Sequence, residues 1–117
     1  MTPDELRART KSFALRVVKL YRSLPRTADA QVMGKQLLRC GTSVAANCRA
    51  TCRARSRAEF AARIGIIAEE ADESGFWLDM LAEAEIVRVA LLKELLQESK
   101  ELTAIFTATQ QSARKRT

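Results

Sequence analysis

The residues most able to do chemistry are gathered in one stretch, LRCGTSVAANCRATCRARSRAEF, at positions 38–60. All three cysteines of the chain, Cys40, Cys48 and Cys52, lie in it. A structural zinc site needs about four Cys or His ligands, often in closely spaced pairs. The chain has no histidine, and no carboxylate stands close to these cysteines in the sequence. We therefore expect no metal site and no cofactor.

The sequence also lacks the histidine partners that a cysteine or serine nucleophile usually has. Only activation by the nearby arginines is therefore left open for the cysteine thiols. Small buried packing residues are the commoner outcome for free cysteines. Gly41-Thr42-Ser43 is too short for a phosphate-binding loop, and Ser43 lacks a histidine base. We expect no catalytic residues and a protein that is not an enzyme.

Placed on a helix, the same stretch presents two narrow strips. Small side chains that would let a neighbouring helix approach closely form the first strip: Gly34, Gly41, Ala45, Cys48 and Cys52. Polar side chains form the second: Gln36, Cys40, Ser43 and Asn47. Buried polar groups are costly unless they are paired, so the second strip is predicted to hydrogen-bond across to other helices.

Capping signals divide the chain into four helices. Thr2-Pro3-Asp4-Glu5 starts the first helix and Leu24-Pro25 ends it. The second is predicted over about 28–54, the third from the capping box that begins at Ser56, and the fourth over about 89–113. No segment resembles a strand and the connections are short, so the prediction is an all-α, antiparallel up-down-up-down four-helix bundle forming a single domain, residues 1–117.

Apolar residues recur at helical spacing and predict the face that each helix buries. The expected seam of the first helix is Leu6, Phe13, Val17, Leu20 and Leu24. That of the third is Phe60, Ile64, Ile67, Ala71, Ser74, Leu78 and Leu81, and that of the fourth is Leu92, Leu95, Leu102, Ile105 and Phe106.

Charge is distributed unevenly along the chain. Residues 7–63 hold 14 Lys and Arg against 2 acidic residues, whereas residues 64–101 hold 3 basic and 10 acidic residues. This polarity indicates either a basic surface for a polyanion or two halves that neutralise each other within one bundle. No apolar run reaches the roughly 18 residues needed to span a bilayer, and the N-terminus lacks a signal-peptide pattern. We expect a cytoplasmic protein with no membrane partner.

Several segments resemble the family of 23S-rRNA intervening-sequence proteins. The segments are KLYRSLP, QVMGKQLLRCGTSVAANCRA, RSRAEF and EEADESGFWLDML. The family usually has Ser at the position of Cys40 and Gly at that of Ala45. Ala50 stands where the family usually has Glu, which leaves Arg49 or Arg53 freer for other partners.

The resemblance implies a bacterial, cytoplasmic, non-enzymatic four-helix bundle that assembles as a ring, often a pentamer. A related branch comprises the accessory variability proteins of diversity-generating retroelements, which implies nucleic acid and a reverse transcriptase as candidate partners. Both implications are expectations about this chain.

Two functional hypotheses follow from the residues. In the first, the chain is a homo-oligomer that binds the phosphate backbone of RNA or DNA with weak sequence preference. The predicted contacts are Lys11, Lys19, Arg22, Arg49, Arg53, Arg55 and Arg57. The alternative within this hypothesis is a solvated basic face without a nucleic-acid partner.

The second hypothesis is a protein-interaction scaffold that uses the acidic third helix. A large apolar residue among carboxylates fits a subunit interface better than a free surface. The predicted interface residues are Ile66, Glu70, Glu73, Trp77 and Met80.

Overall fold

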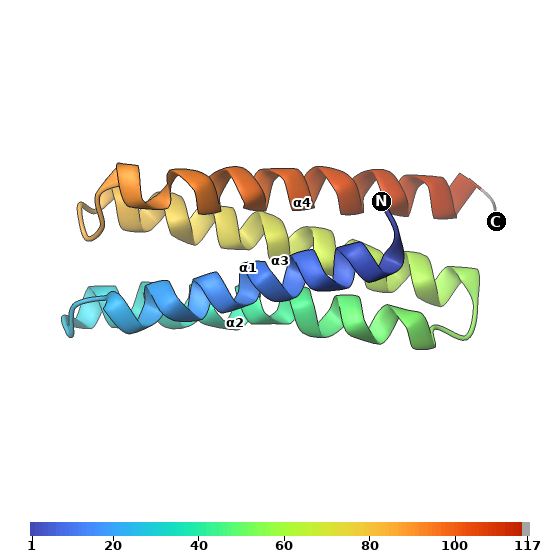
Figure 1. Cartoon of the computed structure of the whole chain (residues 1–117), viewed down its shortest axis with the longest axis horizontal. Coiled ribbons are helices and arrows are strands. Elements are labelled where there is room, and N and C mark those ends of the chain that lie inside the picture. Colours follow the sequence, from blue (N-terminus) through green and yellow to red (C-terminus); the bar gives the residue numbers. More distant parts are fainter. Residues whose placement is uncertain (116–117) are drawn as a thin grey trace.

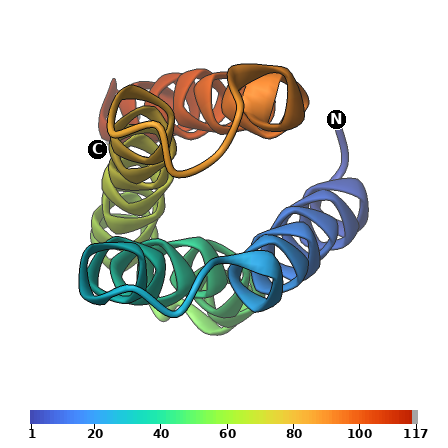
Figure 2. The same cartoon turned by 90° about the vertical axis from the view of Figure 1, so that its left-hand side faces the viewer.

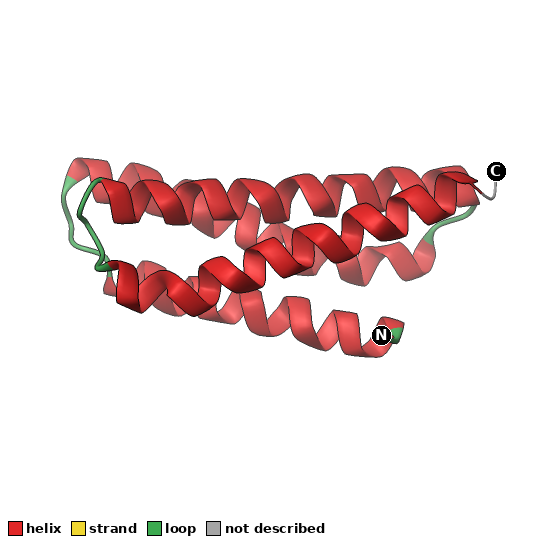
Figure 3. Cartoon of the chain, turned by 90° about the horizontal axis from the view of Figure 1, so that it is seen from above, coloured by secondary structure: helices red, strands yellow, loops and turns green. Residues whose placement is uncertain are grey.

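Four antiparallel helices make up the computed structural model, which describes residues 1–115. They are α1 (Pro3–Ser23), α2 (Ala28–Ala50), α3 (Arg57–Glu83) and α4 (Val89–Lys115), and a short 3-10 helix, η1 (Thr51–Arg53), follows α2. The bundle measures 47 × 22 × 20 Å (Figure 1). Within the described residues there is no strand (Figure 3). The predicted fold class is confirmed, although the last two residues of the expected domain, 116 and 117, lie outside the described part.

The helix starts are set by the predicted caps. The Thr2 hydroxyl accepts the backbone N–H of Glu5 at 3.1 Å, and the Ser56 hydroxyl accepts that of Glu59 at 3.1 Å. The Glu59 carboxylate accepts the backbone N–H of Arg55 and also a bond from the Arg63 side chain. Both bonds lower the pKa of Glu59. Backbone N–H groups at the start of a helix have no partner within the helix, and the bonds to the Thr2 and Ser56 hydroxyls each satisfy one of them.

The end of α2 differs from the prediction. The α-helix ends at Ala50 rather than near position 54, and the chain tightens into η1 before Ala54 turns extended. The Thr51 hydroxyl donates to the carbonyl of Cys48 at 2.6 Å. Such local side-chain bonds compete with the regular helix and are common where a last turn tightens.

One hydrophobic core joins all four helices, and most of its members on α1, α3 and α4 come from the predicted seams. No seam was predicted for the second helix, which contributes Leu37. Phe13, Val17, Leu37, Ile67 and Phe106 are almost fully buried. Thr10 and Ser99, which the seams omitted, are also buried, and each hydroxyl donates to a carbonyl of its own helix. These two polar side chains are therefore satisfied without a partner on another helix.

The small strip of α2 does lie against α1. A β-carbon built on Gly41 would approach both methyl carbons of Val17 to 3.0 Å. At Gly34 the same addition would come within 2.5 Å of Leu24. Glycine at these two positions is what allows α1 and α2 to pack at their present separation.

The polar strip of α2 behaves differently from the prediction. Asn47 donates to Ser43 at 2.9 Å and Gln36 accepts from Arg39, so both stay within α2. Only Cys40 reaches another helix, because its sulfur lies 3.3 Å from the Ser74 hydroxyl of α3. Polar residues three or four positions apart on a helix can satisfy one another, and this removes the need for partners across the bundle.

Helices α1 and α4 close the bundle only loosely. Each helix packs along its sequential neighbours, whereas α1 and α4 share few contacts, and the view along the long axis shows the ribbons of these two helices apart (Figure 2). Arg9 of α1 bridges the two helices by donating to both carboxylate oxygens of Glu98 at 2.7 Å and to Glu101 at 2.8 Å. The Glu98 bonds are the main reason that the pKa of Arg9 is raised further.

Candidate nucleic-acid interface

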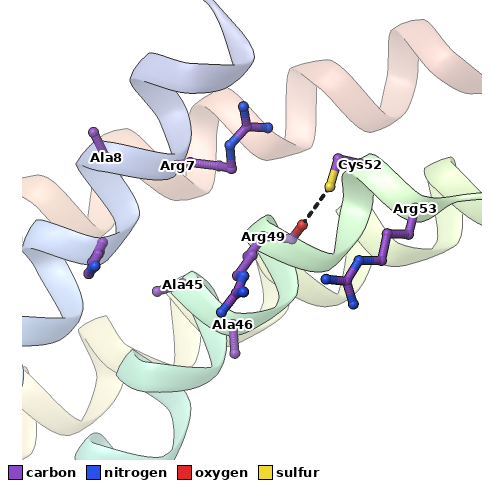
Figure 4. Close-up of a pocket in the computed structure, with 8 residues that line it drawn as sticks. Arg7, Ala8, Ala45, Ala46, Arg49, Cys52 and Arg53 are labelled. Atoms are coloured by element: carbon purple, nitrogen blue, oxygen red, sulfur yellow. Dashed lines mark hydrogen bonds between the residues drawn. The ribbon is translucent and has the colours of Figure 1, made fainter.

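Basic side chains from α1 and α2 meet around a hollow of about 710 Å³. Figure 4 shows it between the first half of α1 and the end of α2, with seven of its lining residues labelled. Four lining side chains are cationic: Arg7, Lys11, Arg49 and Arg53. The other lining residues are Ala8, Ala45, Ala46 and Cys52.

Helical spacing and antiparallel packing bring these cations together. Arg7 and Lys11 are four residues apart on α1, so they lie along one side of that helix. Arg49 is in the last turn of α2 and Arg53 ends η1, and both line the same hollow. The two helices run in opposite directions, which sets the start of α1 beside the end of α2 (Figure 1). Alanines fill the positions between the pairs, and their single methyl groups leave the space open.

The hollow is electropositive because four cationic residues and no acidic residue line it. Lys11, Arg49 and Arg53 are exposed and make no ion pair with any residue between 1 and 115. Arg7 is partly neutralised by Asp4, which lies three residues before it on the same helix. Three cations with uncompensated charge and one shared cation therefore face the same space, which favours an anionic ligand.

The structure gathers only some of the predicted nucleic-acid contacts. Lys11, Arg49 and Arg53 line the hollow, and Lys19 lines an adjoining one on the outer face of α1. Three predicted contacts lie outside both hollows. Arg22 is in the last turn of α1, Arg55 is in the link before α3, and Arg57 is the first residue of α3. These three are exposed and extend the basic surface without joining the cluster.

Sequence reasoning missed Arg7 and the alanines as members of this site. The available signal was the four-residue spacing of Arg7 and Lys11, which puts both on one side of a helix. What the sequence did not supply was the level at which α1 crosses α2. That level is fixed by packing, for example by Val17 against Gly41.

The three cysteines do not share one environment. Cys40 and Cys48 are buried, and burial raises the pKa of both thiols. Cys52 is exposed at the edge of the hollow, and its thiol donates to the carbonyl of Arg49 at 3.0 Å. The expectation of buried packing residues is thus confirmed for Cys40 and Cys48 and wrong for Cys52, which lies in η1 between α2 and α3.

A thiol and two carboxylates meet where α2 faces α3. Cys40 offers a sulfur, and Glu70 and Glu73 offer oxygens, that lie within 4.8 Å of one another. Both carboxylates are already engaged by Arg39, and the Trp77 indole also donates to Glu73 at 3.2 Å. Three ligand atoms, two of them on carboxylates that pair with Arg39, do not supply the four that a structural zinc site takes. The expectation of no metal remains a prediction.

Two of the five predicted interface residues on α3 contact this chain's own α2. Glu70 and Glu73 pair with Arg39 of α2, and Trp77 and Met80 are half-buried. Ile66 is 46% exposed and faces outward, as does Phe76, which is 53% exposed and was not predicted. The Phe76 ring meets Trp77 edge-on with centroids 4.9 Å apart. The exposed apolar residues of this helix are therefore Ile66 and Phe76 rather than Trp77.

Comparison with known proteins identifies the chain's relatives. The family model of the 23S rRNA-intervening sequence protein matches residues 5–108. The chain belongs to this family. A solved structure from Bacteroides thetaiotaomicron, a protein of unknown function from the S23 ribosomal protein family, is 32% identical in sequence. The match covers 95% of this chain and 99% of that one, with a TM-score of 0.86.

No curated protein matches the sequence. Membership of the family agrees with the resemblance in the segments quoted above, and the solved relative shares the four-helix fold. None of the helices in residues 1–115 is long and apolar enough to cross a membrane.

Proposed function

We propose that this chain is a non-enzymatic, cytoplasmic homo-oligomer that binds RNA or DNA through the phosphate backbone. The observation that carries the proposal is the hollow between α1 and α2, where four cations meet with no acidic lining residue. The family's name, which refers to an intervening sequence of 23S rRNA, adds support.

The chemistry of the cluster suits phosphates. Arginine guanidinium groups offer two parallel N–H donors to a phosphate, and lysine adds a point charge. Contacts to phosphates carry little sequence information, so we expect weak sequence preference. An oligomeric ring, pentameric if it follows the family resemblance, would repeat the cluster and raise the overall affinity through multivalency.

A salt titration with a matched charge control tests the proposal. In the test variant Lys11, Arg49 and Arg53 are changed to Gln, and in the control the exposed Arg88, Lys93 and Lys100 are changed to Gln. Both lose three positive charges. Fluorescence anisotropy with mixed-sequence oligonucleotides should show affinity that falls steeply with salt in the wild type and the control.

In the test variant the slope of log affinity against log salt should flatten by about 2, since each single-strand phosphate contact contributes about 0.7. All sequences should weaken alike. Absence of binding by the wild type at micromolar protein and low salt would refute the proposal. Equal losses in the test and control variants would refute the assignment to this hollow.

A second candidate function is a protein-interaction scaffold, such as an accessory subunit of a reverse transcriptase in a diversity-generating retroelement. The observation that favours it is the exposure of Ile66 and Phe76 on an α3 whose outward positions are otherwise mainly acidic. Co-purification with a reverse transcriptase encoded beside the gene, lost when Phe76 is changed to Glu, would support this candidate. Retention of the complex by that variant would contradict it.

A further inference from the structure

Apolar lining distinguishes this hollow from a simple basic patch. Ala8, Ala45 and Ala46 contribute methyl groups between the cations, and the space of about 710 Å³ is of the size that small organic ligands occupy. Phosphates alone would be bound equally well by cations on a convex surface. The concave, partly apolar shape therefore has room for more than the backbone of a nucleic acid.

The same chemistry continues along α1. A second hollow of about 430 Å³ shares Ala8 and Lys11 with the first and adds Ser12, Leu15, Arg16 and Lys19. Leu15 is 60% exposed. Lys11 and Lys19 are eight residues apart, which is about 12 Å along the helix axis. We call the two adjoining hollows the α1–α2 track. It combines cationic and apolar side chains over a length that suits a short segment of a single strand.

We propose that the α1–α2 track binds single-stranded nucleic acid, with an unpaired base in the first hollow and the flanking phosphates on its cationic rim. This inference rests on the proposed function and specifies the strand state that the site selects. In a duplex the bases are stacked and paired, so only phosphates would reach the rim. A single strand can turn a base out onto apolar side chains, which adds affinity that a duplex cannot gain.

The lining of the first hollow also predicts weak base selectivity. The only uncharged polar side-chain group in the first hollow is the Cys52 thiol, and it already donates to the Arg49 carbonyl. Bases would be held by apolar contact and by stacking on the faces of the guanidinium groups. Every base has a flat face that can make these contacts. A single-strand preference without a sequence preference is the expected signature.

Filling the first hollow separates this inference from the proposed function. Ala46→Leu adds bulk at an exposed helical position and leaves every cation in place, and Ala62→Leu makes the same change at an exposed position of α3. We would measure the affinity of each protein for a mixed-sequence 12-mer, single-stranded and duplex, at equal low salt. Wild type and Ala62→Leu should prefer the single strand by about fivefold, a little below the range for base stacking on aromatic residues.

Ala46→Leu should lose this preference while its duplex affinity stays within about twofold of wild type. Leu15→Ser tests the second hollow independently and should weaken only the single strand. Cys52 supplies a direct readout in the wild type, because a base in the hollow should slow alkylation of this thiol by N-ethylmaleimide and a duplex should not.

Each outcome decides between the proposals. Binding of both forms with equal affinity, unchanged by Ala46→Leu and with Cys52 unprotected, would overturn the single-strand inference and leave the proposed function standing. Binding of neither form would overturn both. Protection of Cys52 by the duplex to the same extent would also overturn the inference, even if Ala46→Leu proved to fold poorly.

Discussion

Arg9 is predicted to be the main tie between α1 and α4, and its removal should open this side of the bundle. The Arg9 side chain is 24% exposed and that of Glu98 is 16% exposed, so the pair lies between a surface and a buried salt bridge. Exposed pairs contribute about 0–1 kcal/mol, whereas removing one partner of a buried pair costs about 3–5 kcal/mol. Arg9→Met should therefore lower the free energy of unfolding by about 2 kcal/mol.

Urea denaturation followed by circular dichroism measures this loss, which should correspond to a fall in Tm of roughly 8 °C for a chain of this size. Arg9→Lys should recover only part of it, because lysine keeps the charge but cannot donate to both Glu98 oxygens. The double variant Arg9→Met with Glu98→Leu should be more stable than Arg9→Met alone, since it no longer leaves a largely buried carboxylate without its cation.

The pH dependence has a definite sign. Gln97 and Arg9 both lower the pKa of Glu101 by donating to its carboxylate. A carboxyl group whose pKa is lowered in the folded state stabilises the fold above its unfolded pKa, and this stabilisation is lost as the pH falls through the folded value. The difference between wild type and Arg9→Met should therefore shrink below about pH 4. A loss under about 0.5 kcal/mol at pH 7, or one unchanged at pH 3, would refute the assignment of the α1–α4 tie to this ion pair.

Three further predictions concern packing, thiols and assembly. Gly41→Leu should destabilise the bundle by about 1–3 kcal/mol in the same urea assay, because even its β-carbon would press on Val17, and a neutral result would contradict the close helix approach. Ellman's reagent should titrate Cys52 rapidly in the folded protein and Cys40 only on unfolding, since burial both shields that thiol and raises its pKa. Phe76→Glu should lower the mass seen by light scattering without loss of helicity, and a wild type already monomeric at tens of micromolar would remove the basis for an interface there.

Local signals in the sequence were enough to predict the helices and the faces they bury. Thr2 and Ser56 cap helices through bonds to residues three positions away, and such bonds need no knowledge of the rest of the chain. The seam of α3 was predicted because a repeat of apolar residues at three- and four-residue spacing marks one side of a helix wherever that helix lies. The end of α2 was less well predicted, because the bond from Thr51 to the Cys48 carbonyl competes with helix continuation and leaves no strong pattern.

Membership of the site depended on which helix faces meet, and no local pattern contains that information. Arg7 and Arg53 are far apart in the sequence and line the same hollow only because α1 and α2 pack antiparallel at a level fixed by Val17 and Gly41. The sequence thus determined the type of each helix, its polar face and the excess of positive charge in residues 7–63. The tertiary structure decided which cations share a concave surface and that Glu73 forms an ion pair with Arg39 of the same chain. The physical reason is that periodicity specifies directions around one helix axis, whereas contacts between helices depend on their separation and relative level, which packing of the whole core sets.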